Sequence, residues 1–141
     1  MDNRRGIIKN RGFANQVRDY SGLRFGNITP TDIDGMIEYK NICYVYIEIK
    51  YLDAELPFGQ RLALERQTDD MQKVKPTITV IVSHNSKGDI DVGNSIVTEF
   101  RWLGQWRKVD SIKSARQVIE RFVNWCETSH NYNRLDLISR P

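Results

Sequence analysis

The residues from Thr31 to Tyr51 constrain the fold of this chain more than any other stretch. They are rich in β-branched and aromatic types, and Lys40-Asn41 interrupts them with a short polar turn. This composition predicts two β-strands joined as a hairpin. Because successive side chains of a strand point to opposite faces, Glu48 and Lys50 are expected on one face. The other face of the second strand is apolar and carries Cys43, Val45, Ile47 and Ile49.

The hairpin also predicts the place of a second carboxylate. Asp34 stands near the start of the first strand, and pairing about Lys40-Asn41 brings it opposite the neighbourhood of Glu48. Two carboxylates this close repel, and a shared proton or a cation between them relieves the repulsion. Mg²⁺, or Mn²⁺ in its place, prefers oxygen ligands and keeps waters that a phosphate can displace. Asp34, Glu48 and the backbone carbonyl of Ile49 would therefore form half of a metal shell.

Lys50 is expected beside this metal shell and points the same way as Glu48. Its ammonium group could orient or help to deprotonate a water and could neutralise charge that builds on a phosphate. The set therefore suits phosphodiester hydrolysis. A purely structural interpretation stands beside this one, because an E-x-K pair also fits a solvated strand face and an Asp before Gly35 also fits a turn.

The run Pro30-Thr31-Asp32-Ile33-Asp34-Gly35, followed by Glu48-Ile49-Lys50, resembles the PD-(D/E)xK nuclease superfamily. That superfamily includes restriction endonucleases, Holliday-junction resolvases and phage exonucleases. The resemblance spans roughly residues 12 to 84. It implies metal-ligand roles for Asp34 and Glu48, with Asp32 as the second choice, and a catalytic role for Lys50. In exonuclease-like branches a Gln on the next helix helps to place the water or the metal shell, which implies this role for Gln60.

The rest of the chain predicts an α/β (α+β) fold with a mixed central β-sheet and flanking helices. Its order resembles the αβββαβ core of restriction-endonuclease-like proteins, followed by a C-terminal β-hairpin and helix. One strand near the beginning of that core is missing from the pattern, and Ile7-Ile8 or residues 22–28 could supply it. The expected elements are a short helix at Gly12–Tyr20, a loop at Ser21–Pro30, a helix at about Phe58–Val74, a buried strand at Thr77–Ser83, a hairpin of Asn94–Trp102 and Trp106–Val109, and a helix from Ser114 to about Ser129.

Two further details of these helices are predicted. In the helix at about Phe58–Val74, the inward residues are expected to be Phe58, Leu62, Met71 and Val74. The last helix is expected to open with a capping box between Ser114 and Gln117.

Length and composition predict one domain over residues 1–141, with a basic arm at about 1–11 and an unstructured or loosely docked tail at about 131–141. No apolar run is long enough for a transmembrane helix, and the N-terminus lacks the apolar core of a signal peptide. We therefore expect no membrane association and a location in the cytoplasm of a bacterial or phage-infected cell. Cys43 and Cys126 stand alone in apolar contexts, which predicts reduced core thiols.

DNA is the expected partner. In the first 26 residues, six basic side chains stand against two aspartates and are interleaved with aromatic residues, which is typical of a phosphate-binding surface. The basic residues are Arg4, Arg5, Lys9, Arg11, Arg18 and Arg24. A second aromatic and basic group lies at residues 100–108 and could stack on unpaired bases. The alternative is that its aromatic side chains pack against a helix.

These observations predict a metal-dependent DNA endonuclease, either structure-selective like a Holliday-junction resolvase or nicking. A two-fold homodimer would suit a duplex or branched substrate. The alternative is a catalytically inactive nuclease-fold module that binds nucleic acid or a protein partner. It is favoured because many superfamily members carry an acidic residue on the first helix, where this chain offers only Asn15, Gln16 and Asp19. A third alternative is an unrelated α+β interaction protein.

Overall fold

The computed structural model describes the backbone of residues 16–139 and the side chains of residues 16–131. The chain divides into two units, residues 1–31 and 32–141. In the first unit, the described residues form the short 3-10 helix η2 (Ser21–Leu23) and a bridge between Phe25 and Ile28. The helix predicted at Gly12–Tyr20 is wrong over residues 16–20, which are irregular, and its first residues lie outside the described range.

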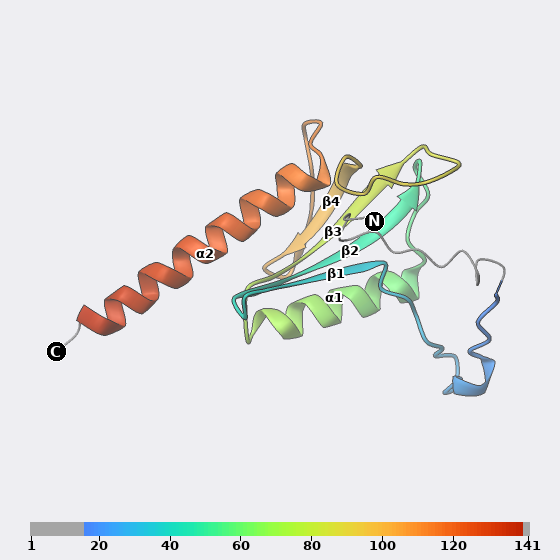
Figure 1. Ribbon diagram of the computed structural model, residues 1–141. Coiled ribbons are helices and arrows are strands. Elements are labelled where there is room, and N and C mark those ends of the chain that lie inside the picture. Colours follow the sequence, from blue (N-terminus) through green and yellow to red (C-terminus); the bar gives the residue numbers. More distant parts are fainter. Residues whose placement is uncertain (1–15, 140–141) are drawn as a thin grey trace, which may run out of the picture. The chain divides into compact units, whose positions relative to one another are not determined.

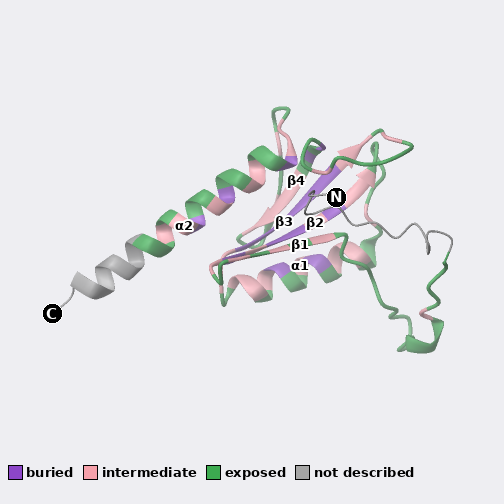
Figure 2. Ribbon diagram, viewed as in Figure 1, coloured by how far each residue is buried: buried purple, intermediate pink, exposed green. Residues whose placement is uncertain are grey.

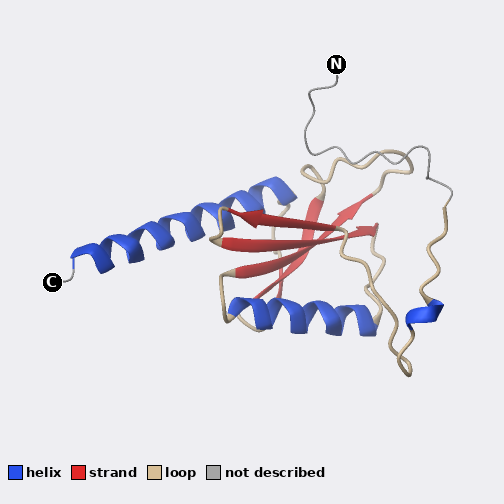
Figure 3. Cartoon of the chain, turned by 60° about the horizontal axis from the view of Figure 1, so that its bottom comes forward, coloured by secondary structure: helices blue, strands red, loops and turns tan. Residues whose placement is uncertain are grey.

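The second unit contains a five-stranded mixed sheet and two helices (Figure 1). The strands lie in the order of the chain, and only β2 and β3 run parallel. They are β1 (Gly35–Tyr39), β2 (Cys43–Tyr51), β3 (Thr77–His84), β4 (Ile96–Trp102) and β5 (Gln105–Lys108). Helix α1 (Phe58–Gln72) connects β2 to β3, and helix α2 (Ala115–Ser139) follows β5. The two helices lie on opposite faces of the sheet (Figure 3). The mixed α and β fold class is thereby confirmed.

The predicted hairpin of β1 and β2 is confirmed. Gly35 pairs with Ile47 and Tyr39 with Cys43 in an antiparallel ladder. The turn between the strands contains Lys40 and Asn41, whose φ angles are 48° and 60°. Asn tolerates this left-handed conformation better than most residues, which explains its place in the turn.

The apolar face of β2 packs against α2, as the alternation of its side chains predicts. Cys43 and Val45 belong to a buried cluster that includes Ala115, Phe122 and Cys126 of α2. Both cysteines are free and buried. β3 is buried over its first six residues because its two neighbouring strands and both helices cover it (Figure 2). Its continuous apolar run is typical of a strand covered on both faces.

Helix α1 does not pack through the residues that the sequence predicts. Phe58 and Val74 are exposed, while Leu64 and Thr68 are buried. Thr68 contacts the sheet through a hydroxyl pair, because its Oγ1 lies 2.6 Å from Oγ1 of Thr79 on β3. The prediction of inward residues is therefore wrong for Phe58 and Val74, while Leu62 and Met71 are partly buried. The helix meets the sheet through polar groups as well as through Leu64.

Ion pairs and one indole complete the contact between α1 and the sheet. Arg61 makes two hydrogen bonds to Glu99, at 2.7 and 3.0 Å, and Arg101 makes two to Asp69, at 3.1 and 2.7 Å. The guanidinium carbon of Arg61 also lies 4.3 Å from the centre of the Trp106 ring. The planar guanidinium group of arginine can make two parallel hydrogen bonds to one carboxylate and can stack on an aromatic ring, which a lysine ammonium cannot do in the same way.

The predicted capping box at the start of α2 is confirmed. The backbone N–H of Gln117 donates to Oγ of Ser114 at 3.2 Å, and the N–H of Ser114 donates to Oε1 of Gln117 at 2.9 Å. The helix then continues to Ser139. The prediction of a helix that ends near Ser129 before an unstructured tail is therefore wrong, at least in the backbone.

Replacing Ser114 with alanine should destabilise the protein, because it leaves the backbone N–H of Gln117 without its partner. We expect a loss of about 1 kcal/mol in the free energy of unfolding, and a fall of about 3 °C in Tm for a domain of this size. Thermal denaturation followed by circular dichroism measures this. Ser111→Ala, at an exposed position before the helix, is the matched control, and an equal fall in both variants would contradict the capping role.

No helix in the described part of the chain has the length and apolar character that a membrane span requires.

Candidate metal and phosphodiester site

Asp34 lies against the second strand of the hairpin. It precedes β1 by one residue, and its Oδ2 accepts a hydrogen bond of 2.8 Å from the backbone N–H of Ile49. Its other oxygen, Oδ1, makes no hydrogen bond with the residues that the structure describes. The bond to Ile49 fixes the Asp34 carboxylate beside β2, where the hairpin register predicted it.

Glu48 is the most unusual side chain of the sheet. It is only 2% exposed, on the face of β2 that α1 covers. Its Oε1 accepts a hydrogen bond of 2.8 Å from Nε2 of Gln60 and lies 3.4 Å from Nζ of Lys50. Its Oε2 is buried and has no hydrogen-bond partner among the described residues. A buried carboxylate oxygen without a partner is costly, and either a bound cation or a proton shared with the nearby carboxylate of Asp34 would relieve that cost.

The charge on Glu48 is disfavoured where it stands. Burial raises the pKa of this carboxyl, and the negative charge of Asp34 raises it further. The cation of Lys50 opposes both effects without cancelling them. A divalent cation between the two carboxylates would favour the ionised form and remove this penalty.

Gln60 contacts the carboxylate directly. It lies in the first turn of α1, is half-buried, and donates to Glu48. Its role was predicted from the family resemblance alone, since a Gln on a helix is also compatible with an exposed position. The crossover from β2 into α1 brings the two residues together.

Asp32 is not brought into this cluster by any contact within the described residues. It is exposed, and its side chain makes no hydrogen bond or ion pair there. Asp34 is thus the aspartate that the fold holds on β2.

The donor set fits a hard divalent cation. Among the described residues, no group of three or more His, Cys, Asp or Glu side chains could hold a metal ion. Mg²⁺ needs only one or two carboxylates and keeps several of its waters. Asp34 and Glu48, with the carbonyl of Ile49, could meet that smaller requirement. A bound cation would also give the buried Oε2 of Glu48 the partner that it lacks among the described residues.

The predicted DNA-contacting residues belong to the N-terminal unit. Arg4, Arg5, Lys9 and Arg11 lie outside the described residues. Arg18 is exposed, and Arg24 donates from Nε to the carbonyl of Gly26 at 2.8 Å. Their contact with DNA stays a prediction.

Arg61, in the first turns of α1, is not available for phosphate binding. It is committed to Glu99 and to the face of Trp106. Sequence reasoning missed this network. The signal was the spacing of Arg61, Glu65 and Asp69 at every fourth position of α1, opposite alternating charges on β4.

No protein-family model, curated protein or solved structure matches this chain.

Proposed function

We propose that this protein is a metal-dependent deoxyribonuclease that hydrolyses phosphodiester bonds as an endonuclease of the PD-(D/E)xK type. The observation that carries the proposal is Glu48, a buried carboxylate whose Oε2 has no partner among the described residues. It lies beside a second carboxylate and a lysine. Native structures rarely leave a buried polar atom without a partner, and a carboxylate oxygen is a preferred ligand of a hard divalent cation.

The arrangement of strands around the site supports the same proposal. The hairpin of β1 and β2 holds Asp34 and Glu48, and the parallel crossover from β2 through α1 to β3 holds Gln60 against Glu48. This is the order that the restriction-endonuclease-like core has from its aspartate strand onward.

Each side chain has a distinct part in the proposed reaction. Asp34 and Glu48 would hold Mg²⁺ or Mn²⁺, which when bound would polarise the scissile phosphate and make a water more acidic. Gln60 donates to Oε1 of Glu48 and so fixes the orientation of that carboxylate. Lys50 would lie beside the phosphate, where its amino group orients the attacking water and offsets negative charge that grows during attack. The water gives up a proton to solvent as its oxygen bonds to phosphorus, and the bond from phosphorus to the leaving oxygen breaks as that oxygen takes a proton from solvent.

Cleavage of labelled DNA tests the proposal. Single-stranded, duplex, flapped and four-way substrates are incubated with the full chain in Mg²⁺, Mn²⁺ or EDTA. We expect cleavage with either metal and none in EDTA, and the preferred substrate will choose between structure-selective cutting and nicking. Binding of DNA without cleavage of any substrate would overturn the proposal in favour of a binding module.

A pair of matched substitutions distinguishes which of the two aspartates, Asp32 or Asp34, is the metal ligand. Asp34→Asn should lower cleavage by at least about a hundredfold, because a neutral amide is a poor ligand for a hard cation. Asp32→Asn, two residues away and exposed, should retain activity within a few-fold of wild type. Single-turnover rates in Mg²⁺ measure both variants. A larger loss in Asp32→Asn than in Asp34→Asn would exchange the two assignments.

A further inference from the structure

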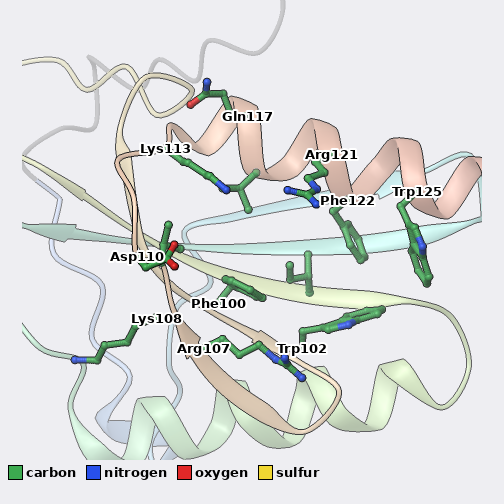
Figure 4. Close-up of a pocket in the computed structure, with 13 residues that line it drawn as sticks. Phe100, Trp102, Arg107, Lys108, Asp110, Lys113, Gln117, Arg121, Phe122 and Trp125 are labelled. Atoms are coloured by element: carbon green, nitrogen blue, oxygen red, sulfur yellow. The ribbon is translucent and has the colours of Figure 1, made fainter.

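A groove of about 650 Å³ lies between α2 and the hairpin of β4 and β5. Phe100 and Trp102 form its floor on the sheet, and Phe122 and Trp125 extend toward them from α2 (Figure 4). Phe100 and Trp102 pack on the core that includes α2, whereas Glu48 faces α1. The groove therefore lies on the opposite face of the sheet from the carboxylate site.

The aromatic side chains of the groove leave one indole open. Trp102 makes edge contacts with Phe122 and Trp125, at centroid distances of 5.5 and 5.6 Å. Trp102 is half-buried by these contacts, but Trp125 remains 52% exposed. A tryptophan that is held at its edge and open to solvent is a platform on which a planar ring can stack.

The charged side chains of the groove are mostly cationic. Arg107, Lys108, Lys113 and Arg121 line it, against the single carboxylate of Asp110. No ion pair joins any of these side chains to a carboxylate in the part of the chain that the structure describes.

Three arginines elsewhere in the same unit are neutralised, whereas Arg66 on α1 is exposed and makes no ion pair among the described residues. Arg61, Arg101 and Arg116 each form an ion pair, with Glu99, Asp69 and Glu120 respectively. The groove therefore combines uncompensated positive charge with an open aromatic face, which together fit an anion that carries flat apolar rings.

We propose that this groove binds single-stranded DNA, with an unpaired base stacked on Trp125 and the flanking phosphates held by Arg107 and Arg121. Bases in a duplex stack on one another, so only an unpaired segment can offer a free ring face. The choice of DNA rests on the proposed function, in which the groove would hold the unpaired arm of a flapped or branched substrate.

Binding without metal tests this groove separately from catalysis. Fluorescence anisotropy with a labelled 12-nucleotide oligothymidylate is measured in EDTA at about 50 mM salt, where phosphate contacts are strong. A duplex of equal length and an oligouridylate are compared with it. We expect the single strand to bind at least tenfold more tightly than the duplex and more tightly than the RNA.

Two variants assign the contacts. Trp125→Ala should weaken binding of the oligothymidylate by about tenfold, the effect of one lost stacked base. Arg121→Gln should lower the slope of log affinity against log salt by about 0.7, the value for one phosphate contact to a single strand. Arg116→Gln, on the same helix but paired with Glu120 and outside the groove, is the matched control.

The results separate this inference from the nuclease proposal. Unchanged oligonucleotide affinity in Trp125→Ala, tighter binding of the duplex or the RNA, or no binding by wild type would overturn the groove assignment. Metal-dependent cleavage could still hold in each case. Self-association that Trp125→Ala abolishes would instead assign the groove to a second copy of the chain. If Lys50→Ala loses cleavage but binds the oligothymidylate as wild type does, the groove is supported independently of the carboxylate site.

Discussion

Lys50→Ala is expected to lower the rate of DNA cleavage by about 10²–10⁴-fold, the range for a positioned group that assists proton transfer or stabilises charge. Nζ of Lys50 lies 3.4 Å from Oε1 of Glu48, and the side chain is only 19% exposed. The substitution therefore removes the one cation in direct contact with the buried carboxylate among the described residues. Single-turnover cleavage at saturating Mg²⁺ measures the effect on the chemical step.

The control for Lys50→Ala is Lys87→Ala, at an exposed loop position, which should cleave at the wild-type rate. Circular dichroism spectra should show that both variants are folded. If Lys50→Ala keeps more than a third of the wild-type rate, the lysine has no part in the reaction and its contact with Glu48 is structural.

Glu48→Gln should abolish cleavage and at the same time stabilise the protein at neutral pH without metal. The pKa of Glu48 is raised in the folded state by burial and by Asp34, so the ionised side chain destabilises the fold. An amide of nearly the same shape still accepts the bond from Gln60 but carries no charge. Removing the buried charge should increase the free energy of unfolding by about 1 kcal/mol, because an ionised group costs more to bury than a neutral polar one, and should raise Tm by about 3 °C.

The stabilisation by Glu48→Gln should depend on pH, and the raised pKa of Glu48 fixes the direction of that dependence. A carboxyl whose folded-state pKa is raised favours folding while it is protonated, and wild type loses this stability as the pH rises from about 4.5 through the raised value. Glu48→Gln lacks that loss. The difference in Tm between variant and wild type, measured in EDTA, should therefore grow from acidic to neutral pH. A variant that is less stable than wild type at pH 7.5 would show that the Lys50 pair stabilises the site as it stands.

The central part of the candidate site could be predicted from the sequence because it depends on local rules. Alternation along β2 separates Glu48 and Lys50 from the apolar side, and a turn at Lys40-Asn41 sets the register that carries Asp34 to Ile49. Both rules act within about twenty residues of chain. The parallel pairing of β3 was predictable for a similar reason, since a strand, a helix and an apolar strand in succession favour a crossover.

The packing of α1 could not be predicted in the same way. Its buried residues include Thr68, and the partners of its charged residues lie on β4 and β5, about 30–40 positions further along the chain. Hydrophobic periodicity does not detect a helix that packs through ion pairs. Phe58 and Val74 were therefore assigned to the core and are exposed. The bond from Gln60 to Glu48 depends on the same packing.

Titration of the wild-type protein with Mn²⁺ by isothermal calorimetry tests the central claim, that the carboxylates of Asp34 and Glu48 hold a divalent cation. Glu48→Gln and the exposed-loop control Asp89→Asn are titrated alongside under the same conditions. We predict saturable binding to wild type and to Asp89→Asn, with affinity reduced at least tenfold in Glu48→Gln. Equal affinity of all three proteins for Mn²⁺, or no binding by wild type, would contradict the account.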